Sequence, residues 1–396
     1  MSKWITRTLG EVTSYIAKGI PPKYVEEEAK STIRVLNQKC NRDFRISYAD
    51  SRIHDNSVKK AAEIKMVRPG DVLINSTGTG TAGRVAQIWN VPTPTTIDGH
   101  MILMRPSDEV DPLYYGYAVK AYQPTIESFA EGSTGQTEIN KTRLQNEILV
   151  NFPVDKKEQY AIGRMLADLD DKIEENEKIN KNLEEQAQSI FANEFLSLAT
   201  LPKGWKQASL IDIADYLNGL AMQKYRPTAD ESGIPVLKIK ELRQGCCNDN
   251  SELCSPSIKS DYIIHDGDVI FSWSGSLLVD FWCGGTCGLN QHLFKVTSNI
   301  YDKWFYYSWT NYYLQKFAAI AADMATTMGH IKREELAKSR VLIPSNSDYE
   351  RIGGLLAPLY DLVISNRIEN SKLATIRDTL LPKLMTGELD VSNINL

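Results

Sequence analysis

Apolar residues recur at alternating spacings of four and three in two long segments of the chain. The first repeat runs through Ile162, Leu166, Leu169, Ile173, Asn176, Asn180, Leu183, Ala187 and Ile190. The second runs through Ile352, Leu356, Leu359, Val363, Asn366, Asn370, Leu373, Arg377, Leu380 and Leu384. A spacing of this kind, kept over several heptads, is typical of a coiled coil. We therefore predict two long helices, within residues 156–198 and 346–396, that pair with each other.

Two asparagines interrupt the apolar seam at matching places in both helices. A polar seam residue lowers stability but fixes the register of a coiled coil. Antiparallel pairing brings amides against amides and apolar side chains against apolar ones. The expected seam pairs are Asn176 with Asn370, Asn180 with Asn366, Ile173 with Leu373, Leu183 with Val363, and Leu166 with Leu380. The pattern thus predicts an antiparallel pair with pseudo-twofold symmetry.

The segment before each helix is a copy of the other. Residues Trp4–Tyr24 align with Trp205–Tyr225 at a constant offset of 201 without a gap, and His100 later matches His292. Short β-branched runs alternate with helical patterns in both copies. We expect an α+β fold of two homologous mixed α/β domains separated by the antiparallel helices. The predicted parts are residues 1–155, 156–198, 199–345 and 346–396.

An aromatic-rich helix is expected at residues 113–130, with a counterpart at 303–319. Aromatic side chains at helical spacing usually belong to a core, and we adopt that interpretation. Stacking of some rings on nucleic-acid bases is the alternative.

The acidic charge sits in the helical segments. The net charge is −5 overall, with +1 in residues 1–155, −4 in 156–198, zero in 199–345 and −2 in 346–396. A neutral domain can still carry a local basic face, and the cations between Arg34 and Arg68 are a candidate, with an ordinary solvated surface as the alternative. No apolar run approaches the roughly 18 residues of a membrane span, and the N-terminus resembles no signal peptide, so we expect a cytoplasmic protein.

No pattern points to chemistry in this chain. The cysteines Cys283 and Cys287 lack a second pair at metal-binding spacing, so we expect free thiols and no metal. The loop from Ser76 to Gly83 contains G-x-G-x-x-G, but no helix follows it and the sister loop loses the pattern, which argues against a dinucleotide site. We predict no catalytic residue and no cofactor bound by this chain.

Along its whole length the chain resembles the DNA-specificity (S) subunits of type I restriction–modification systems. The motifs that carry the resemblance are the duplicated start at Leu9-Gly10-Glu11 and Leu210-Ile211-Asp212, the loops at Lys18-Gly19 and Asn218-Gly219, the triplets Gly70-Asp71-Val72 and Gly267-Asp268-Val269, Asn290-Gln291-His292, and the tail Leu380–Leu389. The first copy departs from this pattern, because Asp98-Gly99-His100 replaces Asn-Gln-His.

The resemblance implies a non-catalytic subunit in which each globular part is a target recognition domain. Each domain would read one half of a bipartite, asymmetric site on double-stranded DNA. The helices would act as a spacer ruler and as a dock for two methyltransferase (M) subunits, with restriction/translocase (R) subunits joining in some systems. The assembly would methylate adenine with S-adenosylmethionine, or translocate and cut DNA with ATP and Mg²⁺, and these cofactors would belong to the partner subunits.

For DNA contacts we select residues in loops matched between the copies, together with nearby cations. They are Lys18, Gly19, Lys23, Lys39, Arg42, Ser76, Thr77, Gly78, Arg84, His100, Lys141 and Arg143 in the first copy, and Gly219, Lys224, Lys240, Ser274, Gly275, His292, Lys332 and Arg333 in the second. Three alternatives stay open: an adaptor that holds proteins with both domains, a nucleotide-dependent enzyme built on the Gly78 loop, and the same fold in a methylation-only or fused system.

Overall fold

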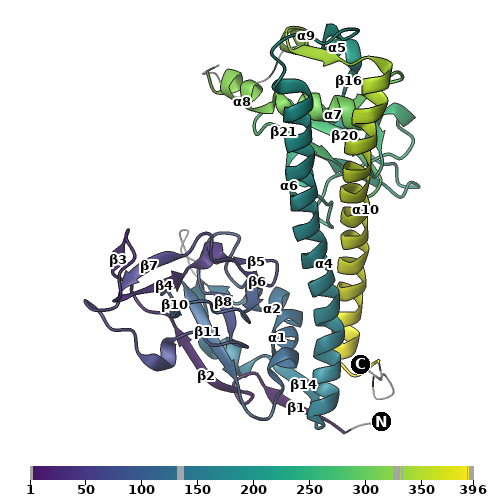
Figure 1. The fold of residues 1–396 in the computed structure, drawn as a ribbon. Helices are drawn as coiled ribbons and strands as arrows, with labels where there is room; N and C mark the ends of the chain where they lie inside the picture. Colours follow the sequence, from purple (N-terminus) through teal and green to yellow (C-terminus); the bar gives the residue numbers. More distant parts are fainter. Residues whose placement is uncertain (1–2, 132–137, 324–330, 332, 390, 392–396) are drawn as a thin grey trace. The chain divides into compact units, whose positions relative to one another are not determined.

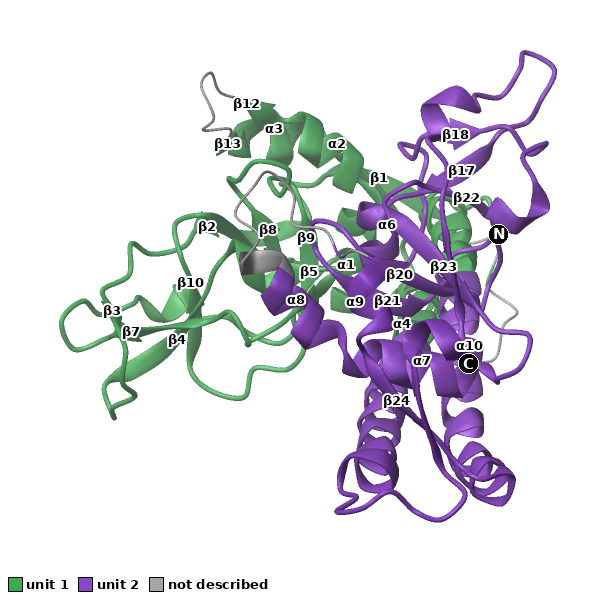
Figure 2. Ribbon diagram, turned by 90° about the horizontal axis from the view of Figure 1, so that it is seen from above, with its two compact units in different colours: residues 1–171, 375–396 green, residues 172–374 purple. Residues whose placement is uncertain are grey.

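The computed structural model describes residues 3–131, 138–323, 331, 333–389 and 391 (Figure 1). The chain divides into two compact units, residues 1–171 with 375–396, and residues 172–374 (Figure 2). Each unit combines one globular domain with parts of both long helices. We refer to these globular parts as domain one and domain two. The four-part division expected from the sequence stays a prediction, because the units cut through the helices.

The two long helices are α4, Lys156–Phe191, and α10, Asn346–Met385. A π-helical turn, Ala192–Leu196, continues α4. In the second unit Asn176 meets Asn370, and in the first unit Arg377 donates to Asp170 at 2.6 Å. In the second unit Asn180, four residues after Asn176, meets Asn366, four residues before Asn370, which confirms antiparallel pairing.

The asparagine pairs in the seam have the predicted register. Asn176 Nδ2 donates to Asn370 Oδ1, and Asn366 Nδ2 donates to Asn180 Oδ1, both at 2.8 Å. Exchanging α4 with α10 converts one bond into the other, so the seam has the predicted pseudo-twofold symmetry. Asn176 and Asn180 are buried, and a buried amide that finds an amide partner avoids the cost of an unmade hydrogen bond.

Domain one is built on a four-stranded sheet of order β2-β11-β8-β9 and a second sheet of order β10-β4-β7-β3. The strands are β1 Trp4–Thr8, β2 Thr13–Lys18, β3 Tyr24–Val25, β4 Thr32–Leu36, β5 Asn41–Arg42, β6 Arg45–Ile46, β7 Arg52–Asp55, β8 Val72–Asn75, β9 Val85–Gln87, β10 Thr95–Ile97, β11 Met101–Pro106, β12 Ala130–Glu131, β13 Glu138–Ile139 and β14 Leu149–Pro153. The helices are α1 Pro112–Ala121, α2 Gln123–Ser128 and α3 Lys141–Asn146, with 3₁₀ turns at Gln38–Cys40 and Glu63–Lys65.

Domain two repeats this plan, with sheets of order β16-β23-β20-β21 and β18-β17-β22-β19. The strands are β15 Lys206–Ser209, β16 Asp215–Asn218, β17 Ile234–Leu237, β18 Leu253–Cys254, β19 Ile263–Ile264, β20 Val269–Ser272, β21 Leu278–Phe281, β22 Cys287–Leu289, β23 Leu293–Thr297 and β24 Arg340–Ile343. The helices are α5 Leu210–Ile213, α6 Ile239–Gln244, α7 Lys303–Tyr312, α8 Leu314–Asp323 and α9 Arg333–Ala337, with 3₁₀ turns at Met222–Lys224 and Ser260–Tyr262.

The gap-free alignment of the two copies is wrong by one residue. In the paired strands Lys18 faces Ile102 while Asn218 faces Phe294, so the offset here is 200. Further on, Leu36 and Leu237 occupy the same place in their parallel pairs, which restores the offset of 201. The cause is a bulge in β2 at Ser14, whose hydroxyl donates to the carbonyl of Pro106 at 2.8 Å. An extra residue in one strand of an antiparallel pair leaves the rest of the ladder intact.

The aromatic helices belong to the cores, as predicted. In α1 Tyr114, Tyr115 and Tyr117 are buried, and in α7 Trp304, Phe305 and Trp309 are buried. Each helix packs against the long helices, because Ile162 and Leu384 share the core of domain one and Ile352 and Leu356 share that of domain two. The cores therefore bind each globular domain to its part of the coiled coil.

The tail after α10 turns back onto the first strand. Gly387 has a φ of 75°, and a side chain there would lie 2.9 Å from the Trp4 ring. Glycine ends the helix in the left-handed conformation without a steric cost. The first strand and the tail are thus in contact within one unit. No helix in the described part of the chain is long and apolar enough to cross a membrane.

Candidate nucleic-acid interface

The predicted contact loops of domain one meet at one edge of its central sheet. Strands β2 and β8 end where β11 begins, because Lys18 faces Ile102 and Asn75 faces Met101. The loops that follow these strands therefore bring Lys18, Thr77 and His100 to the same edge. We call this edge, with Gly19 and Gly78, the loop edge of domain one.

Domain two has the same loop edge. Asn218 ends β16 opposite Phe294, and Ser272 ends β20 opposite Leu293, where β23 begins. The residues that follow include Gly219, Ser274 and Gly275, with His292 just before β23. Sequence analysis selected these loops correctly as a matched pair of structures, although their contact with DNA stays a prediction.

A hydroxyl–histidine pair holds both loop edges in the same way. Thr77 Oγ1 lies 2.9 Å from His100 Nδ1, and Ser274 Oγ lies 3.2 Å from His292 Nδ1. The backbone N–H of His100 donates to the Asp98 carboxylate at 2.9 Å, and that of His292 donates to the Asn290 amide oxygen at 3.2 Å. The departure Asp98-Gly99-His100 therefore keeps the local contact of the second copy.

The loop-edge glycines are required by packing. A side chain at Gly19 would overlap the carbonyls of Ile97 and Asp98, and one at Gly219 would overlap those of Leu289 and Asn290. Ser76 is fully buried, so its side chain presents no surface to a ligand in this structure. For these residues a contribution through the shape of the loop fits the geometry better than a side-chain contact.

The cations beside the loop edges differ between the domains. Lys18 pairs with Glu138, and burial followed by the nearby charge of Lys141 lowers the pKa of Lys18. Lys141 is exposed at the start of α3, and Arg333 is exposed at the start of α9. The two helices correspond, since Ile139 donates to the carbonyl of Ser76 at 2.8 Å and Ile331 donates to that of Trp273 at 3.0 Å.

This correspondence changes the predicted cation pairs. Lys141 matches Arg333, whereas Arg143 matches Glu335 and is already paired with Glu131 and Glu147. Lys332 lies outside the described residues. One exposed cation at the start of each helix is thus the feature common to the described parts of both domains.

Four predicted residues of domain one line a pocket that includes neither Thr77 nor His100. Lys39, Arg42, Gly78 and Arg84 line a pocket of about 550 Å³ together with Lys120 from α1. Sequence analysis missed Lys120, Gln38 and Asn41, which also line it. The remaining predicted cations are exposed on other loops and helices: Lys23 before β3, Lys224 in a 3₁₀ turn and Lys240 on α6.

Domain two carries an aromatic side chain that sequence analysis also missed. Trp273 is half-buried in the loop after β20 and donates from Nε1 to the Asn218 side-chain oxygen at 3.0 Å. With Arg333 it lines an open hollow of about 460 Å³. Ile139 donates to the carbonyl of Ser76 and Ile331 donates to that of Trp273, so Trp273 occupies in domain two the position that Ser76 has in domain one. The matched triplets Gly70-Asp71-Val72 and Gly267-Asp268-Val269, extended by four residues, already align Ser76 with Trp273, so this exchange could have been found from the sequence.

The described residues form no cluster of three or more potential metal ligands from histidine, cysteine, aspartate or glutamate. The six cysteines are free thiols, and Cys283 is buried. Burial raises the pKa of the Cys283 thiol to about 11, which disfavours its reactive thiolate form.

Comparison with known proteins gives a family match along both halves. The family model for the type I restriction modification DNA specificity domain matches residues 1–185 and 202–376. The MjaIX specificity subunit of Methanocaldococcus jannaschii is 26% identical over 375 residues, which cover 88% of this chain and 84% of that protein. The HindI specificity subunit of Haemophilus influenzae is 20% identical over 471 residues, covering 98% and 100%.

The fold also matches a solved structure. The type I restriction-modification S subunit from M. genitalium superposes with a TM-score of 0.59 at 17% sequence identity. The match covers 99% of this chain and 97% of that one. At this identity the likeness concerns the fold.

Proposed function

Since the chain belongs to the type I restriction modification DNA specificity family, we propose that its two domains read different halves of one bipartite DNA site. The observation that carries this proposal is the pair of loop edges. Both are held by a hydroxyl–histidine pair, but Asn218 replaces Lys18 in domain two, and the half-buried Trp273 replaces the fully buried Ser76. The two loop edges share one backbone arrangement but carry different side chains, which suits double-stranded DNA whose two half-sites differ in sequence.

The two kinds of residue at a loop edge have different tasks in this proposal. Lys141 and Arg333 contact phosphates, which positions a domain without reading sequence. Side chains in the loops after the central strands reach base edges in a groove, where donor and acceptor patterns distinguish base pairs. Trp273 adds an aromatic face that can pack on a base or sugar in domain two.

The helices set the spacing between the half-sites and dock the methyltransferase subunits. Ile179, Leu355 and Leu362 each stand one residue before a seam position, and in an antiparallel pair such positions border the same flank. Their exposed fractions are 37%, 46% and 45%. The opposite flank carries the ion pairs of Arg367 with Glu184 and Asp280, which bind the helices to domain two. An apolar flank left in solvent suits a protein partner.

The chemistry of the assembly is assigned to the partners. Methyltransferase subunits would bind S-adenosylmethionine and methylate adenine, and restriction subunits, where present, would use ATP and Mg²⁺. This chain contributes recognition and geometry.

Sequencing of DNA methylation tests the half-site proposal. Cells that carry this chain with its methyltransferase subunits should gain methyl-adenine at two different half-sites separated by a fixed gap. Exchanging domain two for that of another family member should change one half-site and leave the other intact. A palindromic or continuous methylated site would contradict the half-site proposal. If no new methylation appears and the chain leaves no footprint on DNA, an adaptor role is favoured instead.

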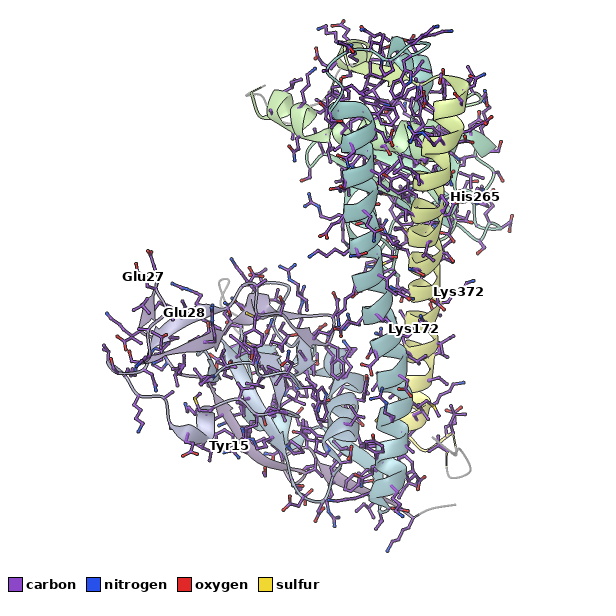
Figure 3. The ribbon with its side chains drawn as sticks, in the orientation of Figure 1. Tyr15, Glu27, Glu28, Lys172, His265 and Lys372 are labelled. Carbon is purple, nitrogen blue, oxygen red and sulfur yellow. The ribbon has the colours of Figure 1, made fainter. Side chains whose placement is uncertain are left out.

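The docking flank has its own test. The double substitution Leu355→Glu and Leu362→Glu should lower recovery of the methyltransferase subunit in co-purification by tenfold or more, because two charges would enter an apolar contact. Lys372→Glu is the control, since Lys372 is exposed on α10 and lies outside the apolar flank (Figure 3). Equal recovery of the three proteins, at unchanged helix content, would remove the docking assignment.

A further inference from the structure

Domain one holds a polar pocket that neither the hydroxyl–histidine pair nor the core explains. Its wall includes four cations from separate segments: Lys39, Arg42, Arg84 and Lys120. None of these four is in an ion pair in the described part of the chain, and Asp43 is the carboxylate in the described lining. A volume of about 550 Å³ lies within the range of about 300–1,000 Å³ typical of small-molecule pockets.

Two amide oxygens in the same wall lack a hydrogen-bond donor. Asn41 is 1% exposed and its Nδ2 donates to the carbonyls of Leu73 and Arg84, which leaves Oδ1 without a partner. Gln38 Oε1 is also buried without a partner. Buried polar atoms in folded proteins nearly always have a partner, so these two unmatched acceptors require an explanation, and a donor that enters the pocket supplies one.

Domain two shows that the fold does not need these amides. The parallel strand pairs place Leu36 and Leu237 at equivalent positions, so Gln38 corresponds to Ile239 and Asn41 to Leu242. Ile239 and Leu242 pack in an apolar cluster, and Ile239 lies 3.8 Å from where a side chain on Gly275 would begin. By this correspondence, helix α6 takes the place of the 3₁₀ turn and the start of the β5–β6 hairpin of domain one.

We propose that this pocket of domain one binds a nucleotide unit, with its phosphate on the cations and an amino group of its base donating to Gln38 and Asn41. The hairpin that closes one side is held in place by two left-handed residues, Asp43 with a φ of 50° and Phe44 with a φ of 64°. The nucleotide can come from the bound DNA strand, in which case the inference rests on the proposed function, or from free nucleotide. In the described part of domain two, Ile239 and Leu242 take the places of Gln38 and Asn41, so the two amide acceptors are not repeated there.

Salt titration of DNA binding tests the first source. The full chain with its methyltransferase subunits binds cognate and random duplexes at several salt concentrations. Arg42→Gln should lower affinity for both duplexes alike and flatten the slope of log K against log salt by about one unit. Lys157→Gln removes the same charge from an exposed position on α4 outside the pocket and should leave the slope unchanged.

Calorimetric titration of the full chain with AMP, IMP and inorganic phosphate tests the second source. AMP presents an amino group where IMP presents a carbonyl, so the wild-type chain should bind AMP about three- to tenfold more tightly. Gln38→Met should remove this preference, and Arg42→Gln should weaken both nucleotides. Unfolding temperatures of both variants verify that the domain remains folded.

The outcomes separate the alternatives. A flattened slope without AMP binding assigns the pocket to a DNA nucleotide, and AMP binding lost in Arg42→Gln with an unchanged slope assigns it to free nucleotide. An unchanged slope together with no AMP binding overturns the proposal. If the wild-type complex binds no DNA, the proposed function fails and the AMP titration alone decides the pocket.

Discussion

Asp98 and Asn290 occupy the same place in the two domains and accept the same backbone hydrogen bond, yet only Asp98 can ionise. Burial raises the pKa of Asp98 above its ordinary value of 3.8. Above its folded pKa the buried carboxylate carries its charge in the folded state, which reduces stability. Below the ordinary value the group is neutral in both folded and unfolded states, and the penalty disappears.

Asp98→Asn should therefore raise the stability of domain one at neutral pH by on the order of 1 kcal/mol. The gain should vanish as pH falls through the folded pKa of Asp98 toward 3.8. Asp55→Asn is the contrasting variant, because hydrogen bonds from Ser57 lower the pKa of Asp55 and its loss should reduce stability above that pKa. Unfolding midpoints measured from pH 4 to 8 would contradict the account if Asp98→Asn were destabilising throughout.

Residue patterns selected the loops that carry the hydroxyl–histidine pairs because those loops recur in both copies, but the pairing itself was not predicted. They did not predict the pocket of domain one, since Gln38, Asn41 and Lys120 have no matching chemistry in domain two and are distant from each other in sequence. Ser76 was selected for its position in a loop, but a strand-end residue can point inward, and only coordinates reveal its burial.

The paired helices are the elements that sequence predicted best. Seam residues recur every three or four positions, so many residues together determine the direction and register of the helix pair. The short strands and helices of the domains were harder to predict from the sequence. The same stretch forms a 3₁₀ turn and hairpin in domain one and α6 in domain two, where the buried Asn41 is replaced by the buried Leu242 and the half-buried Gln38 by the half-buried Ile239.

The seam asparagines carry a prediction at this scale. Asn176→Leu leaves Oδ1 of the half-buried Asn370 without its amide donor and should cost about 1–3 kcal/mol. The double variant Asn176→Leu with Asn370→Leu should recover this loss or exceed the wild type, because apolar side chains then meet in the seam. Denaturant unfolding followed by helical circular dichroism measures both. Equal midpoints for the single and double variants would contradict the expected recovery.

At the scale of the whole molecule, α4 and α10 both pass from one compact unit into the other. Any change in their length is therefore shared by the two domains. A heptad adds about 10.5 Å to a helix and returns to the same seam, whereas three heptads add about 32 Å. One turn of B-DNA is about 34–36 Å.

Inserting three heptads after Ile173 and before Leu373 should lengthen the gap between half-sites by about one DNA turn and keep methylation. One heptad at the same places should abolish methylation, because about three base pairs turn the second half-site about a third of the way around the duplex. Methylation sequencing of both variants decides this. A gap that does not change with three heptads would contradict the ruler function of the helices.

The exchange symmetry of the asparagine bonds has a consequence for assembly. A second α10 could present Asn366 and Asn370 to the first in the same reciprocal way, so the seam itself does not discriminate self-association from the native partner. Discrimination falls to Glu184 and Asp170, which pair with Arg367 and Arg377 and have no acidic equivalents on α10. Loss of both carboxylates would remove the charge pairs that favour α4 over a second α10 and would allow helix exchange between molecules.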